Sequence, residues 1–343
     1  MTKKAAAGNI VCFGEVLLRL SAPGKELLLQ TGGFDAHVGG AEANVAVSLS
    51  KLGHASAVIT SLPDNPLGRA CCDELRRHGV DTSSIEFREG RMGLYFLTHG
   101  AGQRPAEVLY DRTQSAFAAA PADLFDWNAL LANTQWLHVS GITPAVSAAC
   151  AEAALRAMTT ARALKVKVSF DCNFRARLWG PRAAEAPQLL RRLCEQADLI
   201  FGDDRDIAFM LGFNAGDATP TERRRKAAAA AFDAFKALQW ITYTERTRHS
   251  VDVQQLAGTL HTSTAVFTTK PYPLHGIVDR IGAGDAFAAG ILHGLISGLT
   301  PQATVDFGTA AACLKHTIPG DFNLLGVGDV ELLLSELQTD VRR

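Results

Sequence analysis

The sequence predicts an α/β fold in which a doubly wound, mostly parallel sheet carries helices on both faces and a small β-sheet is added as a lid. Short apolar runs typical of buried strands alternate along the chain with longer segments of helical periodicity, the order that a parallel sheet requires. Two other segments interrupt this order with alternating apolar and polar residues. The 343 residues suit one large α/β domain with an insert, or two ordinary domains.

The predicted elements follow in chain order. The strands are NIVCFG (9–14), ASAVITSL (55–62), WLHVSG (136–141), VKVSFD (166–171), DLIFGD (198–203), QWITYT (239–244) and HGIVDR (275–280). The helices between them are AEANVAVSLSKLG (41–53), GRACCDELRRHGV (68–80), SAACAEAALRAMTTARAL (147–164) and PQLLRRLCEQA (187–197). Thr219, Pro220 and Glu222 are typical of an N-cap, a first turn and a capping box, so the arginines that follow are expected on a solvated helix face.

The two interrupting segments are predicted to form the lid. EVLLRLSAPGKELLLQTGGFDAHV and RMGLYFLTHGAGQRPAEVLYDRTQ favour antiparallel strands with Gly or Pro turns. We assign residues 15–37 and 91–115 to one lid assembled from two insertions, and residues 1–14, 38–90 and 116–343 to the core. The alternative is an ordinary extension of the sheet with no gating role.

Composition excludes several classes of protein. The formal net charge of −1 argues against broad nucleic-acid binding. The seven cysteines have no metal-ligand spacing and favour reduced thiols in the cytoplasm. The N-terminal MTKKAAAGNI has no export signature, and no run is long enough to span a membrane.

The motif VDRIGAGDAFAAGILHGL places two glycines and an acid at the start of an apolar helix. The backbone N–H groups of Gly282, Ala283 and Gly284 are therefore predicted to form a cradle for an anion. Asp285 would repel a phosphate, which makes sense if it accepts a proton from a hydroxyl that attacks that phosphate. The alternative is an Asp that caps a helix after a glycine turn.

Three further motifs carry polar residues at positions suited to a ligand. HVGGAEANVA puts Gly39 and Gly40 before a helix whose first turn carries Asn44. Other polar residues follow the strand VKVSF or lie in LYDR on the predicted lid: Asp171, Asn173, Arg175, Tyr110 and Arg112. Because strand ends of a parallel sheet meet at one edge, we expect these residues to share a site.

These motifs resemble the ribokinase-like (PfkB) carbohydrate kinases over nearly the whole chain. GGAEANVA and DRIGAGDAFAAG are similar to the two signatures of that family, in the right order and separation. The segments GLYF, LYDR, HVSGITPAVS, DCNFR and KHTIPGDFN resemble the 2-keto-3-deoxygluconate kinases most.

The resemblance implies a role for each matching residue. Asp285 matches the catalytic base, and the backbone at Gly282, Ala283 and Gly284 matches the anion hole. Positions that hold sugar hydroxyls match Gly39, Gly40 and Asn44, and the set that surrounds an acid substrate matches Tyr95, Tyr110, Arg112 and Arg175. Guanidinium groups bind planar carboxylates through paired hydrogen bonds, although Arg175 could instead face ATP phosphates.

The nucleotide side departs from the family pattern. Asp203 and Asp206 stand where relatives carry an Asn and a Glu that help to order Mg²⁺, so the two acids are predicted either to serve the metal through water or to cap a helix. YTERTRHS replaces a Gly-rich turn. Asn173, Thr244 and Arg246 are the candidate nucleotide contacts, together with Gly282 and Gly284.

The prediction from these motifs is a cytoplasmic, ATP- and Mg²⁺-dependent kinase that phosphorylates the terminal hydroxyl of 2-keto-3-deoxygluconate. The alternatives are a kinase of a neutral ketose such as fructose and a non-catalytic sugar-binding homologue. A dehydrogenase is disfavoured because no GxGxxG opens the first strand–helix unit. Exposed lid strands favour a homodimer. Dependence on a monovalent cation and the phosphate donor stay open.

Overall fold

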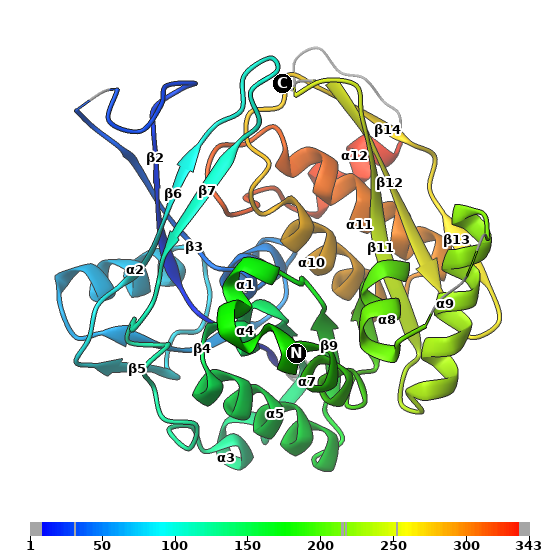
Figure 1. The fold of residues 1–343 in the computed structure, drawn as a ribbon, viewed down its shortest axis with the longest axis horizontal. Coiled ribbons are helices and arrows are strands. Elements are labelled where there is room, and N and C mark those ends of the chain that lie inside the picture. The colour runs from blue at the N-terminus through cyan, green and yellow to red at the C-terminus, as the bar shows by residue number, and fades with distance from the viewer. Residues whose placement is uncertain (1–8, 31, 214–215, 217, 252, 336–343) are drawn as a thin grey trace, which may run out of the picture.

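The larger sheet forms the centre of the structure. The computed structural model describes residues 9–30, 32–213, 216, 218–251 and 253–335, so the N-terminal MTKKAAAG and the ends of the predicted core lie outside the described residues, as does residue 31 of the predicted lid. Within the described part, the larger sheet has ten strands in the order β13-β12-β11-β10-β9-β8-β1-β4-β5, with β14 paired to β12 (Figure 1). The mostly parallel α/β fold is confirmed.

The strands run parallel from β5 to β11 and antiparallel beyond it. The parallel strands are β1 (Asn9–Phe13), β4 (Ser56–Pro63), β5 (Ile85–Arg88), β8 (Thr134–Ser140), β9 (Lys167–Asp171), β10 (Leu199–Phe201) and β11 (Trp240–Arg248). The antiparallel strands are β12 (Val253–His261), β13 (Val266–Thr268) and β14 (Tyr272–His275). The chain adds strands on both sides of β1, so the topological switch point, where such sheets bind ligands, lies at β1.

Helices cover both faces of this sheet. One hydrophobic core contains residues of α1 (Ala41–Lys51), α2 (Pro66–Arg77), α10 (Ala283–Ile296), α11 (Pro301–Lys315) and α12 (Val327–Leu334). The other contains residues of α3 (Trp127–Leu131), α4 (Ile142–Val146), α5 (Ala148–Ala163), α6 (Ala176–Trp179), α7 (Ala186–Cys194), α8 (Asp204–Leu211) and α9 (Pro220–Ala234). A 3₁₀ turn, Gly180–Glu185, joins α6 to α7. Side chains of β1 alternate between the two cores, which explains why buried parallel strands read as continuous apolar runs.

The two interrupting segments form a separate four-stranded sheet, as predicted. Its order is β3-β2-β6-β7, with β2 (Leu17–Ser21), β3 (Asp35–Gly39), β6 (Gly93–Thr98) and β7 (Glu107–Asp111). Each insertion makes an antiparallel pair, as predicted, and the two insertions are joined by the parallel pair β2–β6, which the sequence did not predict. The two insertions leave the core in the same direction, and this places β2 and β6 side by side (Figure 1).

The predicted strand HGIVDR is also wrong. Strand β14 ends at His275, and the chain then runs as a loop up to the helix α10. Gly276 has a φ of 61°, which ends the extended conformation. Beyond it, the backbone N–H of Val278 donates to the carbonyl of His316 at 2.9 Å, and the carboxylate of Asp279 accepts from the N–H of Ile281 at 3.0 Å. Apolar residues here belong to a fixed loop.

The predicted start of helix α9 is confirmed. Thr219 caps α9 with Pro220 in the first turn and Glu222 in a capping box. All seven cysteines are buried and none forms a disulfide. None of the helices in the described ranges has the length and apolar character needed to cross a bilayer.

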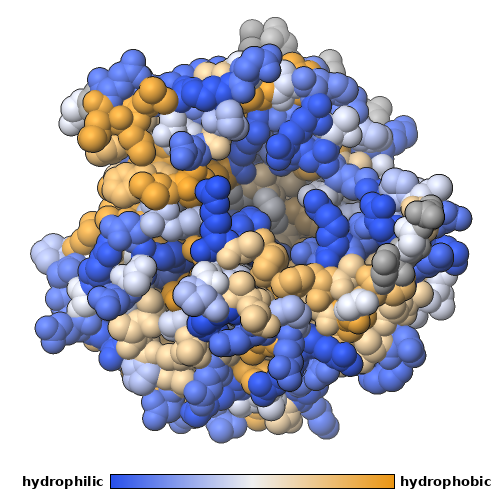
Figure 2. All heavy atoms as spheres, in the orientation of Figure 1, coloured by the Kyte–Doolittle hydropathy of each residue, from blue (hydrophilic) through white to orange (hydrophobic). Residues whose placement is uncertain are grey.

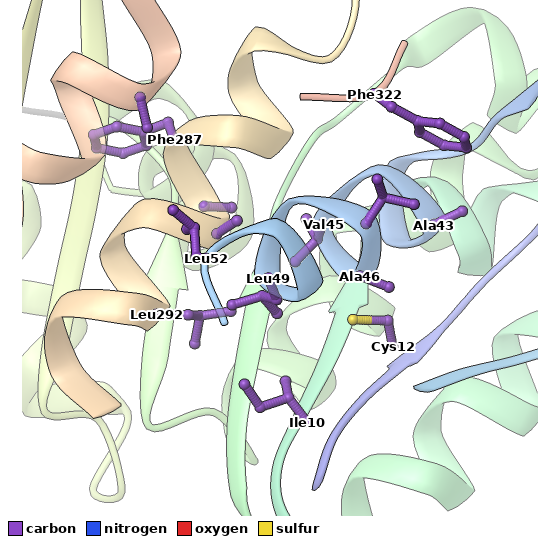
Figure 3. Close-up of a cluster of buried hydrophobic side chains, with 14 of the residues drawn as sticks. Ile10, Cys12, Ala43, Val45, Ala46, Leu49, Leu52, Phe287, Leu292 and Phe322 are labelled. Atoms are coloured by element: carbon purple, nitrogen blue, oxygen red, sulfur yellow. The ribbon is translucent and has the colours of Figure 1, made fainter. Parts of the chain in front are cut away.

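Helix α1 packs against both the large sheet and α10. Figure 3 shows Leu49 of α1 and Leu52, just after its end, close to Leu292 of α10, while Ala46 faces Cys12 of β1. Because both helices begin near the carboxyl ends of the strands, this packing brings their N-termini together.

Candidate active site

A cavity of about 260 Å³ lies between the carboxyl ends of the parallel strands and the small sheet. Figure 2 shows the surface hollowed in this region, with hydrophilic residues around the hollow. Of the predicted residues, the cavity brings together Gly40, Asn44, Tyr95, Tyr110, Arg112, Asn173, Arg175, Gly282, Gly284 and Asp285. The two signature motifs and the small sheet therefore meet at one place.

The start of α10 depends on the conformation of Gly282. Its φ of 80° is left-handed, and a Cβ there would stand 1.9 Å from the carbonyl oxygen of Asp321. Only glycine fits both constraints. Ala283 is the first residue of α10, and Gly284 and Asp285 follow it in the first turn. The N–H of Ala283 makes a long hydrogen bond of 3.4 Å to the carbonyl of Arg280. The first N–H groups of a helix have no intrahelical carbonyl partner, as an anion-binding terminus requires.

Asn44 of α1 orients the carboxylate of Asp285. The Asn44 Nδ2 donates to Asp285 Oδ2 at 2.7 Å, whereas the Asn44 Oδ1 is buried without a hydrogen-bond partner in the described structure. The preceding Gly40 has a φ of 134°, and a Cβ there would lie 2.2 Å from the carbonyl oxygen of Glu15. The glycine pair thus lets α1 begin directly against the end of β1, and the amide oxygen of Asn44 is left available to a hydroxyl in the cavity.

Four carboxyl groups at the cavity have raised pKa values: those of Asp171, Glu42, Asp285 and Asp321. Burial is the main cause: it raises the pKa of Asp285 to about 7 and the pKa of Glu42 to about 7. Burial, followed by repulsion from Asp285, raises the pKa of Asp171 to about 8. Glu42 is 2% exposed and accepts from the N–H of Ser140 at 2.9 Å and from the hydroxyl of Thr143 at 2.7 Å. The cavity therefore holds acids that ionise near neutral pH, which suits proton transfer.

Arg112 does not face the cavity as a free cation. Its Nε donates to the carboxylate of Glu15 at 2.7 Å, and its Nη2 lies 2.5 Å from the same oxygen. Glu15 follows β1 directly, is 3% exposed and also accepts from the hydroxyl of Ser115. Glu15 therefore fixes the orientation of Arg112 and neutralises its charge.

Arg175 differs from Arg112 in its charge environment. It follows β9, lines the cavity, is exposed, and makes no ion pair or hydrogen bond of its side chain within the described residues. Asn173 adopts a φ of 34° and donates from Nδ2 to the hydroxyl of Ser140 at 3.2 Å. The turn after β9 thus presents to the cavity a guanidinium without an ion pair among the described residues, and its charge partly offsets the raised pKa values of the nearby Asp171, Asp206 and Asp285.

The small sheet contributes two tyrosines. Tyr95 and Tyr110 are cross-strand partners, and their rings lie 6.1 Å apart. The Tyr95 hydroxyl donates to Asp321 Oδ2. Gly39 does not line the cavity. It packs closely against Asp321, because a Cβ at position 39 would come within 2.1 Å of the same Asp321 oxygen.

Of the predicted nucleotide contacts, Asn173, Gly282 and Gly284 line the cavity, whereas Thr244 and Arg246 lie outside it, as do the predicted metal residues Asp203 and Asp206. Asp203 and Asp206 form a capping box at the start of α8, and Asp203 also pairs with Arg205 at 2.5 Å. Thr244 is exposed on β11. Arg246 donates to Gln254 Oε1 at 2.8 Å. YTERTRHS is therefore a strand that enters the β11–β12 hairpin, and the capping alternative describes the observed contacts of the two acids.

Sequence analysis did not single out Glu15, Glu42 or Asp321 as site residues, although all three line the cavity. A signal existed for the first two, since an acid that directly follows the first strand, or that starts a helix after GG, lies at the switch point. Asp321 had no such signal, because its partners lie far away in the sequence.

Comparison with known proteins places this cavity in a family context. The model of the pfkB family of carbohydrate kinases matches residues 7–323. The chain is 33% identical to the 2-dehydro-3-deoxygalactonokinase of Haloferax volcanii over 95% of this chain and 96% of that protein. It is 28% identical to the 2-dehydro-3-deoxygluconokinase of Bacillus subtilis over 92% of this chain and 91% of that protein. The solved 2-dehydro-3-deoxygluconokinase of Thermotoga maritima matches with a TM-score of 0.89 and 38% identity, and covers 96% of this chain and 99% of that one.

The raised pKa of Asp285 predicts a pH-dependent gain in stability for Asp285→Asn. The pKa of this carboxyl is about 7 in the folded protein and ~3.9 in the unfolded chain. The free energy of unfolding of the wild type therefore falls as the pH rises through this range. The variant should therefore match the wild type near pH 4 and exceed its free energy of unfolding above pH 7 by roughly 1–3 kcal/mol. Denaturant titrations at both pH values measure this, and a difference that does not change with pH would contradict it.

Proposed function

Because the chain belongs to the pfkB family of carbohydrate kinases, we propose that it transfers the γ-phosphoryl group of ATP to the terminal hydroxyl of a 2-keto-3-deoxy sugar acid, with 2-keto-3-deoxygluconate as the preferred substrate. The match to the family model confirms the predicted family, and the match to the solved structure confirms the ribokinase-like fold. The observation that carries the finer proposal is the guanidinium of Arg175, which makes no ion pair among the described residues, in the same cavity as Asp285. The similar proteins from Haloferax volcanii, Bacillus subtilis and Thermotoga maritima, which are named as 2-dehydro-3-deoxygalactonokinase or 2-dehydro-3-deoxygluconokinase, support it.

The proposed chemistry assigns the proton to Asp285. In its ionised form this carboxylate accepts the proton of the sugar hydroxyl as that oxygen attacks the γ-phosphorus. A pKa of about 7 for Asp285 keeps the base partly ionised at neutral pH and still basic enough to take the proton. The N–H groups at Gly282, Ala283 and Gly284 would stabilise the charge on the transferring phosphoryl oxygens. Asn44 would hold the carboxylate in place through its hydrogen bond.

The acid group of the substrate would meet Arg175 first. A carboxylate binds a guanidinium through two parallel hydrogen bonds, and of the two candidate arginines only Arg175 makes no ion pair with a protein carboxylate in the described structure. Arg112 supports the same pocket from the small sheet, where its guanidinium also lies 5.8 Å from the Tyr110 ring centroid. Tyr95 and Tyr110 would add hydroxyl contacts to the sugar.

The acids near the cavity differ in how well they could hold Mg²⁺. The carboxylate of Asp203 is occupied by the cap of α8 and by Arg205, so it suits a structural role. Burial and repulsion by Asp285 and Asp206 raise the pKa of Asp171, and a divalent cation beside these acids would relieve that repulsion. We propose that Asp171 and the second carboxylate oxygen of Asp206, whose Oδ2 accepts from the N–H of Asp203 at 3.0 Å, hold Mg²⁺ through water. The ion would neutralise phosphate charge.

A kinase of a neutral ketose is the nearest alternative, since fructokinases also occur among the similar proteins. Such a substrate would leave the charge of Arg175 without a partner. A non-catalytic sugar-binding homologue would have no need of a carboxylate with a pKa of about 7 at the phosphate cradle.

The function is tested by the specificity constants for ATP-dependent phosphorylation of 2-keto-3-deoxygluconate, its galactonate counterpart and fructose. Arg175→Leu should lower kcat/KM for the acids by about 10- to 100-fold, the equivalent of a charge-assisted hydrogen bond, and for the neutral ketose by much less. Arg177→Leu is the matched control, because Arg177 is an exposed neighbour that does not line the cavity. In the same assay Asp285→Asn should lose roughly 10²–10⁴-fold in kcat.

Equal losses for acid and ketose in Arg175→Leu would refute recognition of the acid by this residue. Near wild-type turnover in Asp285→Asn would refute its role as base. Arg112→Leu is a less clean probe, because it leaves the buried Glu15 unpaired; the double variant Arg112→Leu/Glu15→Gln removes that penalty.

We propose that the small sheet acts as a lid that excludes water. Its β6–β7 turn closes through the Ala101 and Arg104 backbone pair at 2.9 and 2.8 Å, and Gly100 lies close to Val251 of the opposite hairpin. Shortening residues 100–105 should leave the core folded and raise ATP hydrolysis relative to sugar phosphorylation. The same shortening of the distant turn 262–265 is the control. Unchanged coupling, with a native circular dichroism spectrum, would argue against a lid.

We also propose that two copies associate through the outer face of the small sheet. Leu109 and Phe96 are cross-strand partners on the face opposite Tyr95, and Phe34 packs on Phe96 with ring centroids 6.0 Å apart. Leu109 is 57% exposed, and Figure 2 shows a hydrophobic patch over this sheet at the upper left. Sedimentation should show a dimer that Leu109→Arg dissociates and that the remote Leu164→Arg does not. A wild-type monomer would refute this association.

A further inference from the structure

Two buried carboxylates lie directly behind the turn that starts α10. Asp279 and Asp321 are 3% and 2% exposed. Asp279 Oδ1 accepts from the N–H of Ile281 at 3.0 Å, and Asp279 Oδ2 accepts from the N–H of Gly320 at 3.0 Å. The carbonyl of Asp321 packs against Gly282. The conformation of the turn therefore depends on where these two acids sit.

A single arginine of the small sheet joins the two acids. Arg19 of β2 is 1% exposed; its Nη2 donates to Asp279 Oδ2 at 2.7 Å, and its Nη1 lies 3.2 Å from Asp321 Oδ1. The fork of a guanidinium can span two carboxylates in this way, whereas an ammonium is a single point charge. Lys315 is also buried nearby, but its Nζ donates to the carbonyl of Ile318 at 3.1 Å.

The same network reaches the sugar cavity. Arg19 and Tyr95 are register partners on the neighbouring strands β2 and β6, and the Tyr95 hydroxyl donates to the other oxygen of Asp321. Tyr95 lines the cavity, whereas Arg19 does not. Two strands of the small sheet thus hold, through side chains, the acids on which the α10 turn rests.

From this arrangement we infer that Arg19 is a positioning residue that couples the seating of the small sheet to the geometry of the anion hole at Gly282–Gly284. When the sheet is seated, the Arg19 guanidinium holds Asp279, and Asp279 holds the N–H of Ile281 at the entrance to the turn. If the sheet moves away, two buried carboxylates lose their main counter-charge, which is strongly unfavourable. The proper geometry of the anion hole is therefore favoured only with the small sheet in place.

The electrostatic environment agrees with this coupling. The Arg19 charge, together with hydrogen bonds, outweighs burial and holds the pKa of Asp279 below its usual value. Burial raises the pKa of Asp321 to about 6 even with Arg19 beside it. The basic groups near Asp321 therefore do not fully offset the effect of its burial. An arginine that merely filled space in the sheet would need neither partner.

The test compares Arg19→Lys with Arg162→Lys in the kinase assay. The lysine keeps the charge at position 19 but cannot span both acids. We expect Arg19→Lys to fold and its KM values for sugar and ATP to change by less than about 3-fold. Its kcat should fall by about 10- to 100-fold, which is less than the ~10²–10³-fold cost of losing an oxyanion-hole donor. Its ATP hydrolysis without formation of sugar product should rise. Arg162 pairs with the buried Asp198 at 3.1 Å outside the cavity, so its variant should lose only stability.

Chemical rescue distinguishes positioning from packing. Arg19→Ala should recover kcat when guanidinium chloride is added at millimolar concentration, and should not recover with the same concentration of sodium chloride. Wild-type kcat in Arg19→Lys, or a kcat loss that only follows the folded fraction, would overturn the inference.

Hydrogen exchange of the wild-type protein provides a reading that does not depend on the variants. On binding the sugar acid, segments 17–21 and 277–284 should gain protection together. Independent changes would overturn the coupling. The inference rests on the proposed function only because it places phosphoryl transfer at this turn. Wild-type turnover in Asp285→Asn would refute that placement. The hydrogen-exchange result would still decide whether the small sheet and the turn are coupled.

Discussion

The hydrogen bond from Asn44 to Asp285 is the interaction on which the rest of the site depends. It joins the first turns of two helices that are 241 residues apart in the chain. Their packing against each other and against β1 brings the two termini to the switch point of the sheet (Figure 3). A glycine that tolerates a positive φ precedes each helix, because each terminus approaches another backbone too closely for a side chain. The sugar side and the phosphate side of the site are thus held by one packed unit.

Burial is the second constraint, and it acts on charge. The cavity gathers more carboxyl groups than basic groups that could neutralise them, so burial raises the pKa values of Asp171, Glu42 and Asp285. This arrangement costs folding stability at neutral pH, as is common where a site must hold a reactive group. In exchange, Asp285 makes no ion pair with a cation among the described residues and can act as a base. The negative charge of the cavity also favours a metal ion beside the phosphates.

Local sequence patterns were enough to predict most of the fold and part of the site. Helix starts such as Gly282–Asp285 and Gly40–Asn44 carry their geometry in a few adjacent residues, so they could be recognised without coordinates. HGIVDR was misassigned because its apolar residues suit a strand, while the contacts that hold it as a loop come from Asp279 and from the distant His316. The parallel pairing of β2 with β6 depends in the same way on how two separate insertions leave the core.

The arginines show why residue type alone cannot assign a role. Arg19, Arg112 and Arg175 all come from segments near the cavity, and their sequences give no sign that they differ. The structure separates them by their ion pairs: Arg19 pairs with two buried acids, Arg112 pairs with Glu15, and Arg175 has no ion pair among the described residues. A guanidinium that already has a carboxylate holds the protein together, and one without a carboxylate is available to an anionic ligand. The net charge offered to the substrate therefore depends on pairings such as Glu15–Arg112, which form only in the folded chain.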